Sequence, residues 1–211
     1  MAETATKQTC VLREVAGVKD VYVGRVLADT TSTYTVDSLR QLAGAKSVTK
    51  SVEEDTLTLY ADNTAYKNKK SVKDPTLELE LTYISPEDLA YVTGQKYDET
   101  RKALIGGTPE DVEIALIYVY QDTDGNNHLC QYFKGSVSTP ETEAQGISDS
   151  ITTSGHTLTF TAVKTNHIFT KYGERISYIE YEESDSPLDF SDFLVTFKDP
   201  DTITEKKPVG E

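Results

Sequence analysis

Alternation of apolar and polar side chains is the feature that most constrains how this 211-residue chain can fold. Residues 76–82, TLELELT, alternate leucine with threonine and glutamate throughout. Successive side chains of a β-strand point to opposite faces of its sheet, so this pattern predicts a strand with one buried and one hydrated face. The same alternation recurs in residues 47–53 (SVTKSVE), 146–152 (GISDSIT) and 156–161 (HTLTFT). The chain is therefore predicted to be built mainly from half-buried strands.

Other segments predict further strands and two hairpins. Residues 113–121, EIALIYVYQ, are almost continuously apolar, which is typical of a strand covered on both faces. They lead through the turn-forming residues 122–127 into HLCQYFKG, so a hairpin is predicted there. A second hairpin is predicted around Ser154 and Gly155, and residues 19–28 and 175–183 supply two more strands.

One helix is predicted in residues 85–94. Ser85 is a suitable N-cap, Pro86 suits the first helical position, and Gly94 is placed to end the helix. A second helical turn is predicted near Pro187, where Phe190, Phe193 and Leu194 share one face. The residues alone thus predict an all-β domain with one short α-helix.

Composition excludes several classes of function. The formal net charge is −14 and the pI is near 4.6, which argues against a protein that grips nucleic acid through phosphates. No apolar run approaches the roughly 20 residues needed to cross a bilayer. The sequence MAETATKQTC lacks an apolar signal segment, so we expect synthesis in the cytoplasm without export by the usual route. Cys10 and Cys130 are expected to be free thiols there, with a disulfide between them as the less favoured alternative.

A search for catalytic or metal-binding patterns gives no candidate, so we expect no enzyme, cofactor or metal. The three histidines lack close-spaced partners, and His128, at a hairpin mouth, is expected to be solvated or hydrogen-bonded. Residues 122–133 begin like a calcium loop, but Asn127 and Phe133 replace its glycine and its bidentate glutamate. Gly106-Gly107 lacks the lysine of a phosphate-binding loop. Cys130 is expected to pack inside a strand.

Four segments together resemble the major tail protein family of long-tailed bacteriophages. They are residues 16–26 (AGVKDVYVGRV), 58–66 (TLYADNTAY), 83–98 (YISPEDLAYVTGQKYD) and 131–163 (QYFKGSVSTPETEAQGISDSITTSGHTLTFTAV). They occur in the family's order, and the similarity runs from about Gly17 to about Tyr181.

This resemblance implies a structural virion protein, made in the cytoplasm of the bacterial host. The implied fold is an antiparallel β-sandwich or open barrel with one short α-helix, and the implied assembly is a stack of hexameric rings that forms a hollow tube for the genome. Expected partners are other copies of the chain and the tape measure, tail terminator and distal tail proteins. Double-stranded DNA would pass through without specific binding, and no membrane insertion is expected.

The resemblance also suggests a division of the chain. We expect an N-terminal arm over residues 1–16, a β domain over residues 17–198 with an assembly hairpin near residues 54–73, and a flexible C-terminal tail over residues 199–211.

The hairpin is expected to reach neighbouring subunits, where its lysines, Lys73 included, would meet an acidic surface that sets register. An ordinary solvated hairpin is the alternative. The residues assigned to this contact are Thr58, Leu59, Tyr60, Ala61, Asp62, Asn63, Tyr66, Lys67, Lys69 and Lys70.

The alternating strands are expected to line the channel, with apolar side chains packed into the subunit and polar ones toward the lumen. Acidic and hydroxyl groups there would not retain DNA as a basic stripe would. The alternative is that they form an outer solvated face. The expected lumen-facing residues are Glu78, Glu80, Thr82, Ser148, Ser150, Thr157 and Thr159.

A monomeric β-sandwich module of the virion or tail that binds a host receptor or carbohydrate is the alternative function. An exposed cluster of aromatic side chains would favour it. Tyr118, Tyr120, Tyr132 and Phe133 could supply one.

Overall fold

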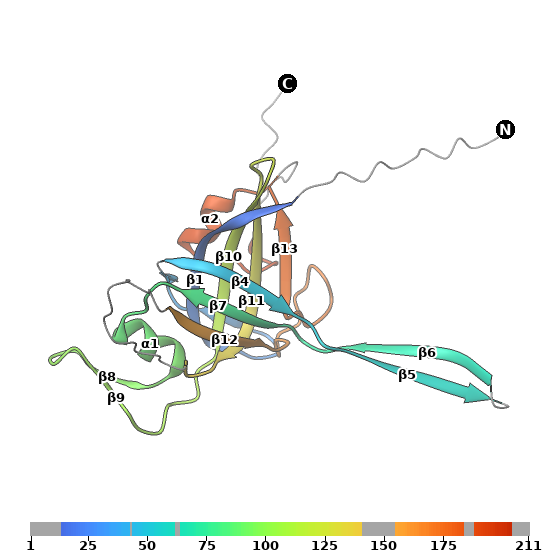
Figure 1. Cartoon of the computed structure of the whole chain (residues 1–211), viewed down its shortest axis with the longest axis horizontal. Coiled ribbons are helices and arrows are strands. Elements are labelled where there is room, and N and C mark those ends of the chain that lie inside the picture. Colours follow the sequence, from blue (N-terminus) through green and yellow to red (C-terminus); the bar gives the residue numbers. More distant parts are fainter. Residues whose placement is uncertain (1–13, 43, 62–63, 141–154, 184–187, 204–211) are drawn as a thin grey trace, which may run out of the picture.

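The computed structural model describes residues 14–42, 44–61, 64–140, 155–183 and 188–203. It is mostly β-structure, with one large antiparallel sheet, two small two-stranded sheets and, within these residues, two short helices (Figure 1). The prediction of a mostly β, antiparallel fold is therefore confirmed.

The large sheet has the strand order β2-β1-β10-β11-β12-β7-β4, with β13 also paired to β11 and β3 also paired to β1. These strands are β1 (Val15–Asp29), β2 (Tyr34–Val36), β3 (Arg40–Gln41), β4 (Ala45–Ser51), β7 (Thr76–Leu81), β10 (Ile114–Asp122), β11 (Asn127–Val137), β12 (His156–Ala162) and β13 (Tyr178–Glu182). The predicted hairpin between β10 and β11 is confirmed.

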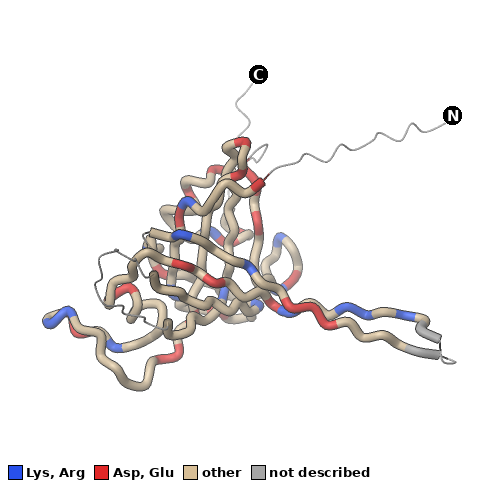
Figure 2. The backbone as a smooth tube through the Cα atoms, viewed as in Figure 1, with Lys and Arg blue, Asp and Glu red and all other residues tan. Residues whose placement is uncertain are grey.

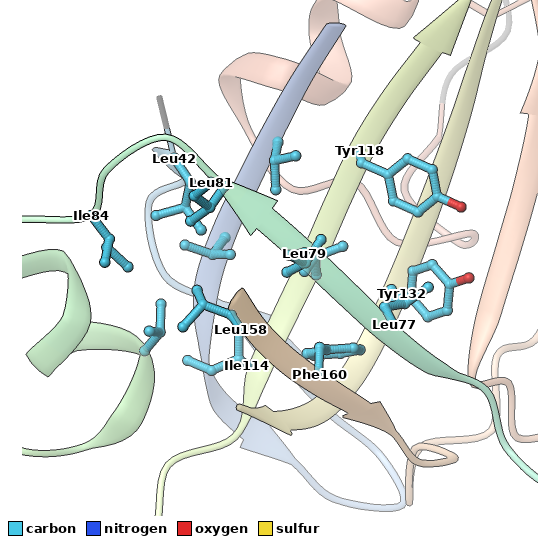
Figure 3. Close-up of a cluster of buried hydrophobic side chains, with 14 of the residues drawn as sticks. Leu42, Leu77, Leu79, Leu81, Ile84, Ile114, Tyr118, Tyr132, Leu158 and Phe160 are labelled. Carbon is cyan, nitrogen blue, oxygen red and sulfur yellow. The ribbon is translucent and has the colours of Figure 1, made fainter. Parts of the chain in front are cut away.

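The main core lies where one half of this sheet crosses the other. Strands β4, β7 and β12 pass across β1, β10 and β11 (Figure 1). The three leucines of β7 are almost fully buried and pack with apolar residues of the other half, as Figure 3 shows. The cluster includes Leu77, Leu79, Leu81, Val21, Val23, Ile114, Leu116, Tyr118, Tyr132, Leu158 and Phe160. The predicted apolar face of residues 76–82 is thus the core face.

Strands β10 and β11 are covered on their second face as well. Ile117, Val119 and Leu129 pack there against α2 (Phe190–Val195), which buries Phe190 and Phe193. This two-sided burial explains why residues 113–121 are almost continuously apolar. The helical turn predicted near Pro187 corresponds to α2, which covers the face of β10 and β11 opposite the main core.

Helix α1 (Pro86–Thr93) forms as its end signals predict. The Ser85 hydroxyl accepts a hydrogen bond from the Asp88 N–H at 3.0 Å, and Gly94 ends the helix in the left-handed region at φ 73°. A Cβ at Gly94 would lie 2.1 Å from the Glu110 carbonyl oxygen, so both backbone conformation and packing require glycine there.

Part of the expected C-terminal tail contacts the body. The Asp201 carboxylate accepts hydrogen bonds from the N–H groups of Thr170 and Lys171 at 2.9 and 2.8 Å. Ile203 packs beside the α2 cluster. The strand predicted in residues 146–153 and the second cysteine, Cys10, lie outside the described residues.

Candidate assembly and channel surfaces

A hydrated face lies on the outer side of β4, β7 and β12. Glu78 stands opposite Thr159 of β12 on one side and Thr49 of β4 on the other. Glu80 stands opposite Thr157 and Ser47 in the same way. Because the leucines between them point into the core, the polar side chains of all three strands share one face. We call this the hydroxyl–carboxylate face.

This face extends over four strands. β11 contributes the exposed Ser136, which stands opposite Thr161 of β12. Its members are Ser47, Thr49, Ser51, Thr76, Glu78, Glu80, Ser136, Thr157, Thr159 and Thr161. Hydroxyl groups therefore outnumber charges on it.

The two glutamates of the face differ in their surroundings. The Lys46 ammonium lies 3.3 Å from Glu80 Oε1, and the Ser47 hydroxyl donates to Glu80 Oε2 at 3.3 Å. Glu78 is exposed and has no ion pair within the described parts of the chain. The ion pair at Glu80 arises from a β-bulge, because the pairing of β4 with β7 passes from Ala45 to Ser47 and leaves Lys46 as the extra residue. The net charge of the face is thus that of about one carboxylate, not two.

The structure brings four of the seven expected lumen residues together on this face: Glu78, Glu80, Thr157 and Thr159. Thr82 follows β7 directly, is exposed, and donates its N–H to the Gly44 carbonyl at 2.7 Å. Ser148 and Ser150 lie outside the described residues. The channel-lining role of this face stays a prediction.

Strand β4 forms one end of the large sheet. Among the described residues it is hydrogen-bonded only to β7, so the other edge of β4 presents unpaired backbone groups. Such an edge is a template for pairing with another chain.

The expected assembly hairpin projects from this same end of the sheet. β5 (Glu54–Ala61) and β6 (Thr64–Val72) pair with each other as a separate sheet, and Figure 1 shows them extending away from the body. They follow β4 and precede β7, and the Lys73 N–H donates to the Glu53 carbonyl at 2.9 Å where the hairpin begins. Leu57 and Tyr66 are 58% and 64% exposed. Residues 54–59 and 66–72 of the hairpin belong to none of the buried clusters of the body.

Charges on the hairpin are arranged in two zones (Figure 2). Near its base Lys73 lies 2.7 Å from Glu53 and Lys70 lies 2.6 Å from Glu54. The Lys73 hydrogen bond lowers the pKa of the Glu53 carboxyl. Farther out, Lys67 and Lys69 are exposed and form no ion pair with any described residue.

Of the residues assigned to the hairpin contact, eight lie on its two strands: Thr58, Leu59, Tyr60, Ala61, Tyr66, Lys67, Lys69 and Lys70. Asp62 and Asn63 lie outside the described residues. Lys70 and Lys73 already have acidic partners within the hairpin, so Lys67 and Lys69 are the cations available to another molecule.

The aromatic residues that could have supplied an exposed binding surface are mainly in the core. Tyr118, Tyr132 and Phe133 are 7%, 0% and 0% exposed. The half-buried Tyr120 donates its hydroxyl to Glu180 at 2.6 Å and stacks on His128 with ring centroids 4.7 Å apart. These four side chains therefore offer no exposed platform for a carbohydrate.

The groups that could have been reactive, Asp122, His128 and Cys130, are held in hydrogen bonds or buried. The Asp122 carboxylate accepts hydrogen bonds from the N–H groups of Asp124 and Asn126, as a hairpin turn requires, and lies 3.5 Å from His128 Nε2. Burial raises the pKa of the Cys130 thiol to about 12, which keeps it protonated and unreactive. Within the described ranges, no three histidine, cysteine or acidic side chains are grouped so as to hold a metal ion.

The sequence model of the phage tail tube protein family matches residues 16–193 of the chain. This match covers the large sheet, the projecting hairpin and α1. The chain belongs to the phage tail tube protein family. No curated protein matches it significantly.

Membership in the phage tail tube family sets the general role of the protein. Tail tube proteins are structural components of the virion and not enzymes, and they assemble with themselves and with other tail proteins. No helix within the described residues is long and apolar enough to span a membrane. The resemblance found in the four sequence segments is thereby confirmed.

Proposed function

We propose that the chain is the major subunit of a phage tail tube, assembled as stacked hexameric rings around a channel through which the genome leaves. The observation that carries this proposal is the hydroxyl–carboxylate face. It is a four-stranded hydrated surface backed by a leucine core, and it ends at the edge of β4, which no other described strand pairs with.

The hydroxyl–carboxylate face has the chemistry that a channel for DNA needs. A basic lining would exchange counterions with the phosphates and bind DNA tightly at low salt. Threonine and serine hydroxyls keep the wall hydrated without attracting phosphate, and Glu78 adds a weak repulsion. Double-stranded DNA would then slide past without a preferred position.

Ring closure would use the edge of β4. Pairing that edge with the next subunit would join the four-stranded faces into one barrel and remove the exposed edge. Six subunits with about four strands each give roughly two dozen strands, more than the 16–18 that leave an aqueous channel in porins. The hydrated face would lie inside this barrel and α2 outside it.

The hairpin β5–β6 would reach across to another subunit, in the same ring or the next one. Leu57 and Tyr66 offer apolar area, and Lys67 and Lys69 offer cations to an acidic partner. Electrostatic contacts of this kind fix register more than they add affinity. We include the tape measure, tail terminator and distal tail proteins as partners at the inside and the ends of the tube.

Electron microscopy of the concentrated, purified protein tests this proposal. The expected images show hollow tubes whose end views have sixfold symmetry and whose side views have a regular ring repeat. A protein that stays monomeric at all concentrations, and is also absent from tubes in virions, would contradict it.

Reversing the two available hairpin charges gives a first prediction. Tubes of Lys67→Glu, Lys69→Glu protein should grow more slowly than wild type, and the defect should shrink as salt rises from about 50 to 500 mM, because exposed ion pairs contribute only about 0–1 kcal/mol each and are screened. Light scattering measures the growth rate. Lys164→Glu, an exposed lysine on the body, is the control for charge reversal. A defect independent of salt would assign the contact to shape and not to charge.

A further inference from the structure

A second projection lies beside α1, apart from the assembly hairpin (Figure 1). β8 (Lys96–Asp98) pairs with β9 (Ala103–Ile105) as a separate two-stranded sheet. Strands this short are marginal when isolated, since a two-stranded sheet has little area to bury. We call residues 96–107 the short arm.

The turn of the short arm is held by its own side chains. Asp98 Oδ1 accepts hydrogen bonds from the N–H groups of Thr100 and Arg101 at 2.9 and 3.0 Å, and the Arg101 guanidinium lies 2.8 Å from Asp98 Oδ2. These bonds, first those from Arg101, lower the pKa of the Asp98 carboxyl. The turn of the arm therefore has a defined shape of its own, while β8 and β9 contact α1 at the base of the arm.

Two glycines end the short arm, directly after β9, and no contact within the subunit requires glycine at either position. A Cβ at Gly106 or Gly107 would meet no atom within 4 Å, and neither residue has a positive φ. This differs from Gly94, where both conditions exclude a side chain. Glycine in such a position lowers stability by increasing the entropy of the unfolded chain. Bare backbone here suits the close approach of another chain.

The surface around these glycines has the character of a contact. Ile105 is 47% exposed directly before them. Lys96 and Lys102 are exposed and form no ion pair with the described residues. The whole chain carries a net charge of −14, so a second copy presents mainly acidic surface to these two lysines.

We propose that the short arm is a second assembly element, which seats Ile105 and the Gly106-Gly107 backbone on an acidic surface of another copy of this chain. The proposal rests on the tube assembly proposed above, but it does not depend on the hairpin β5–β6. Apolar contact supplies affinity, and Lys96 and Lys102 orient the approach.

Photocrosslinking tests the partner. With p-benzoylphenylalanine in place of Ile105, irradiated tubes should yield a covalent dimer of the chain, and mass spectrometry of the junction peptide should identify a site rich in aspartate or glutamate. The same probe in place of Glu174, an exposed body residue, measures background crosslinking. Dimer yield no higher than this background would overturn the proposal.

Glycine replacement tests the close approach. Gly106→Ala, Gly107→Ala protein should keep or slightly raise the midpoint of thermal unfolding but lose at least half of its rate of tube growth. Gly17→Ala is the matched control, since Gly17 also has open surroundings and no positive φ. Normal growth of the double variant, or an equal loss in the control, would overturn the proposal that the short arm is an assembly element. The proposal that the chain forms a tail tube would be unaffected. If the wild-type chain forms no tubes, both proposals fall together.

Discussion

Deleting the hairpin β5–β6 should give a folded subunit that no longer forms tubes. The design removes residues 54–72 and joins Glu53 to Lys73 through Asn-Gly. These two residues already face each other across the pair, with the Lys73 N–H bonded to the Glu53 carbonyl, so a two-residue turn can close the strands. Residues 54–59 and 66–72 belong to none of the buried clusters, so we expect the core to be retained.

Circular dichroism, thermal unfolding and electron microscopy together measure this result. The β-type spectrum should be unchanged and the unfolding midpoint should move by only a few degrees, as expected for a loss well below about 1 kcal/mol. Tubes should be absent, or should fall apart into single rings. Normal tubes from this variant would show that the hairpin is not an assembly element.

Replacing Glu78 with lysine should slow the release of DNA from otherwise normal virions. The change turns the hydroxyl–carboxylate face from about one net negative to one net positive charge per subunit, because Lys46 already pairs with Glu80. Six such lysines in each ring would make a set of phosphate contacts comparable with the 6–10 that alter DNA affinity by about 10³–10⁵-fold between 50 and 200 mM salt. Glu78 is solvated, so folding should be unaffected.

An ejection assay on purified particles measures this effect. Release should be slow or incomplete at about 50 mM salt and should approach the wild-type rate at several hundred millimolar. Glu174→Lys, the same charge change on an exposed body residue, should eject normally. Equal kinetics for the two variants would place Glu78 away from the path of the DNA.

The local pattern of side chains predicts much of this fold, because each half-buried strand carries its own signal. TLELELT specified both faces of β7, and the end signals at Ser85 and Gly94 specified α1. The four channel candidates that the structure brings together come from two segments about 80 positions apart in the sequence. Both segments alternate apolar and polar residues, and this shared pattern predicted that their polar side chains lie on a hydrated face.

Features that depend on pairing register or on weak local signals were not predictable. The bulge at Lys46 reverses the direction that strict alternation gives this side chain, so its ion pair with Glu80 appears only in three dimensions. The strands of the short arm have three residues each, too few for a period of two to be recognised. The pairing of Lys70 and Lys73 with Glu54 and Glu53 likewise required the hairpin register.

The central claim is that the hydroxyl–carboxylate face lines a closed channel, and size-selective labelling of assembled tubes tests it most directly. Single cysteines replace Glu78 on this face and Val195 on α2, which is 78% exposed and lies across β10 and β11 from the main core. Cys10 is changed to serine, and the native Cys130 is buried and protonated. In tubes, Glu78→Cys should react with N-ethylmaleimide but not with a maleimide carried on a large globular protein, whereas Val195→Cys should react with both. In dissociated subunits both positions should react with both reagents. If the protein-borne maleimide modifies Glu78→Cys in intact tubes as fast as Val195→Cys, the face lies outside and the account is wrong.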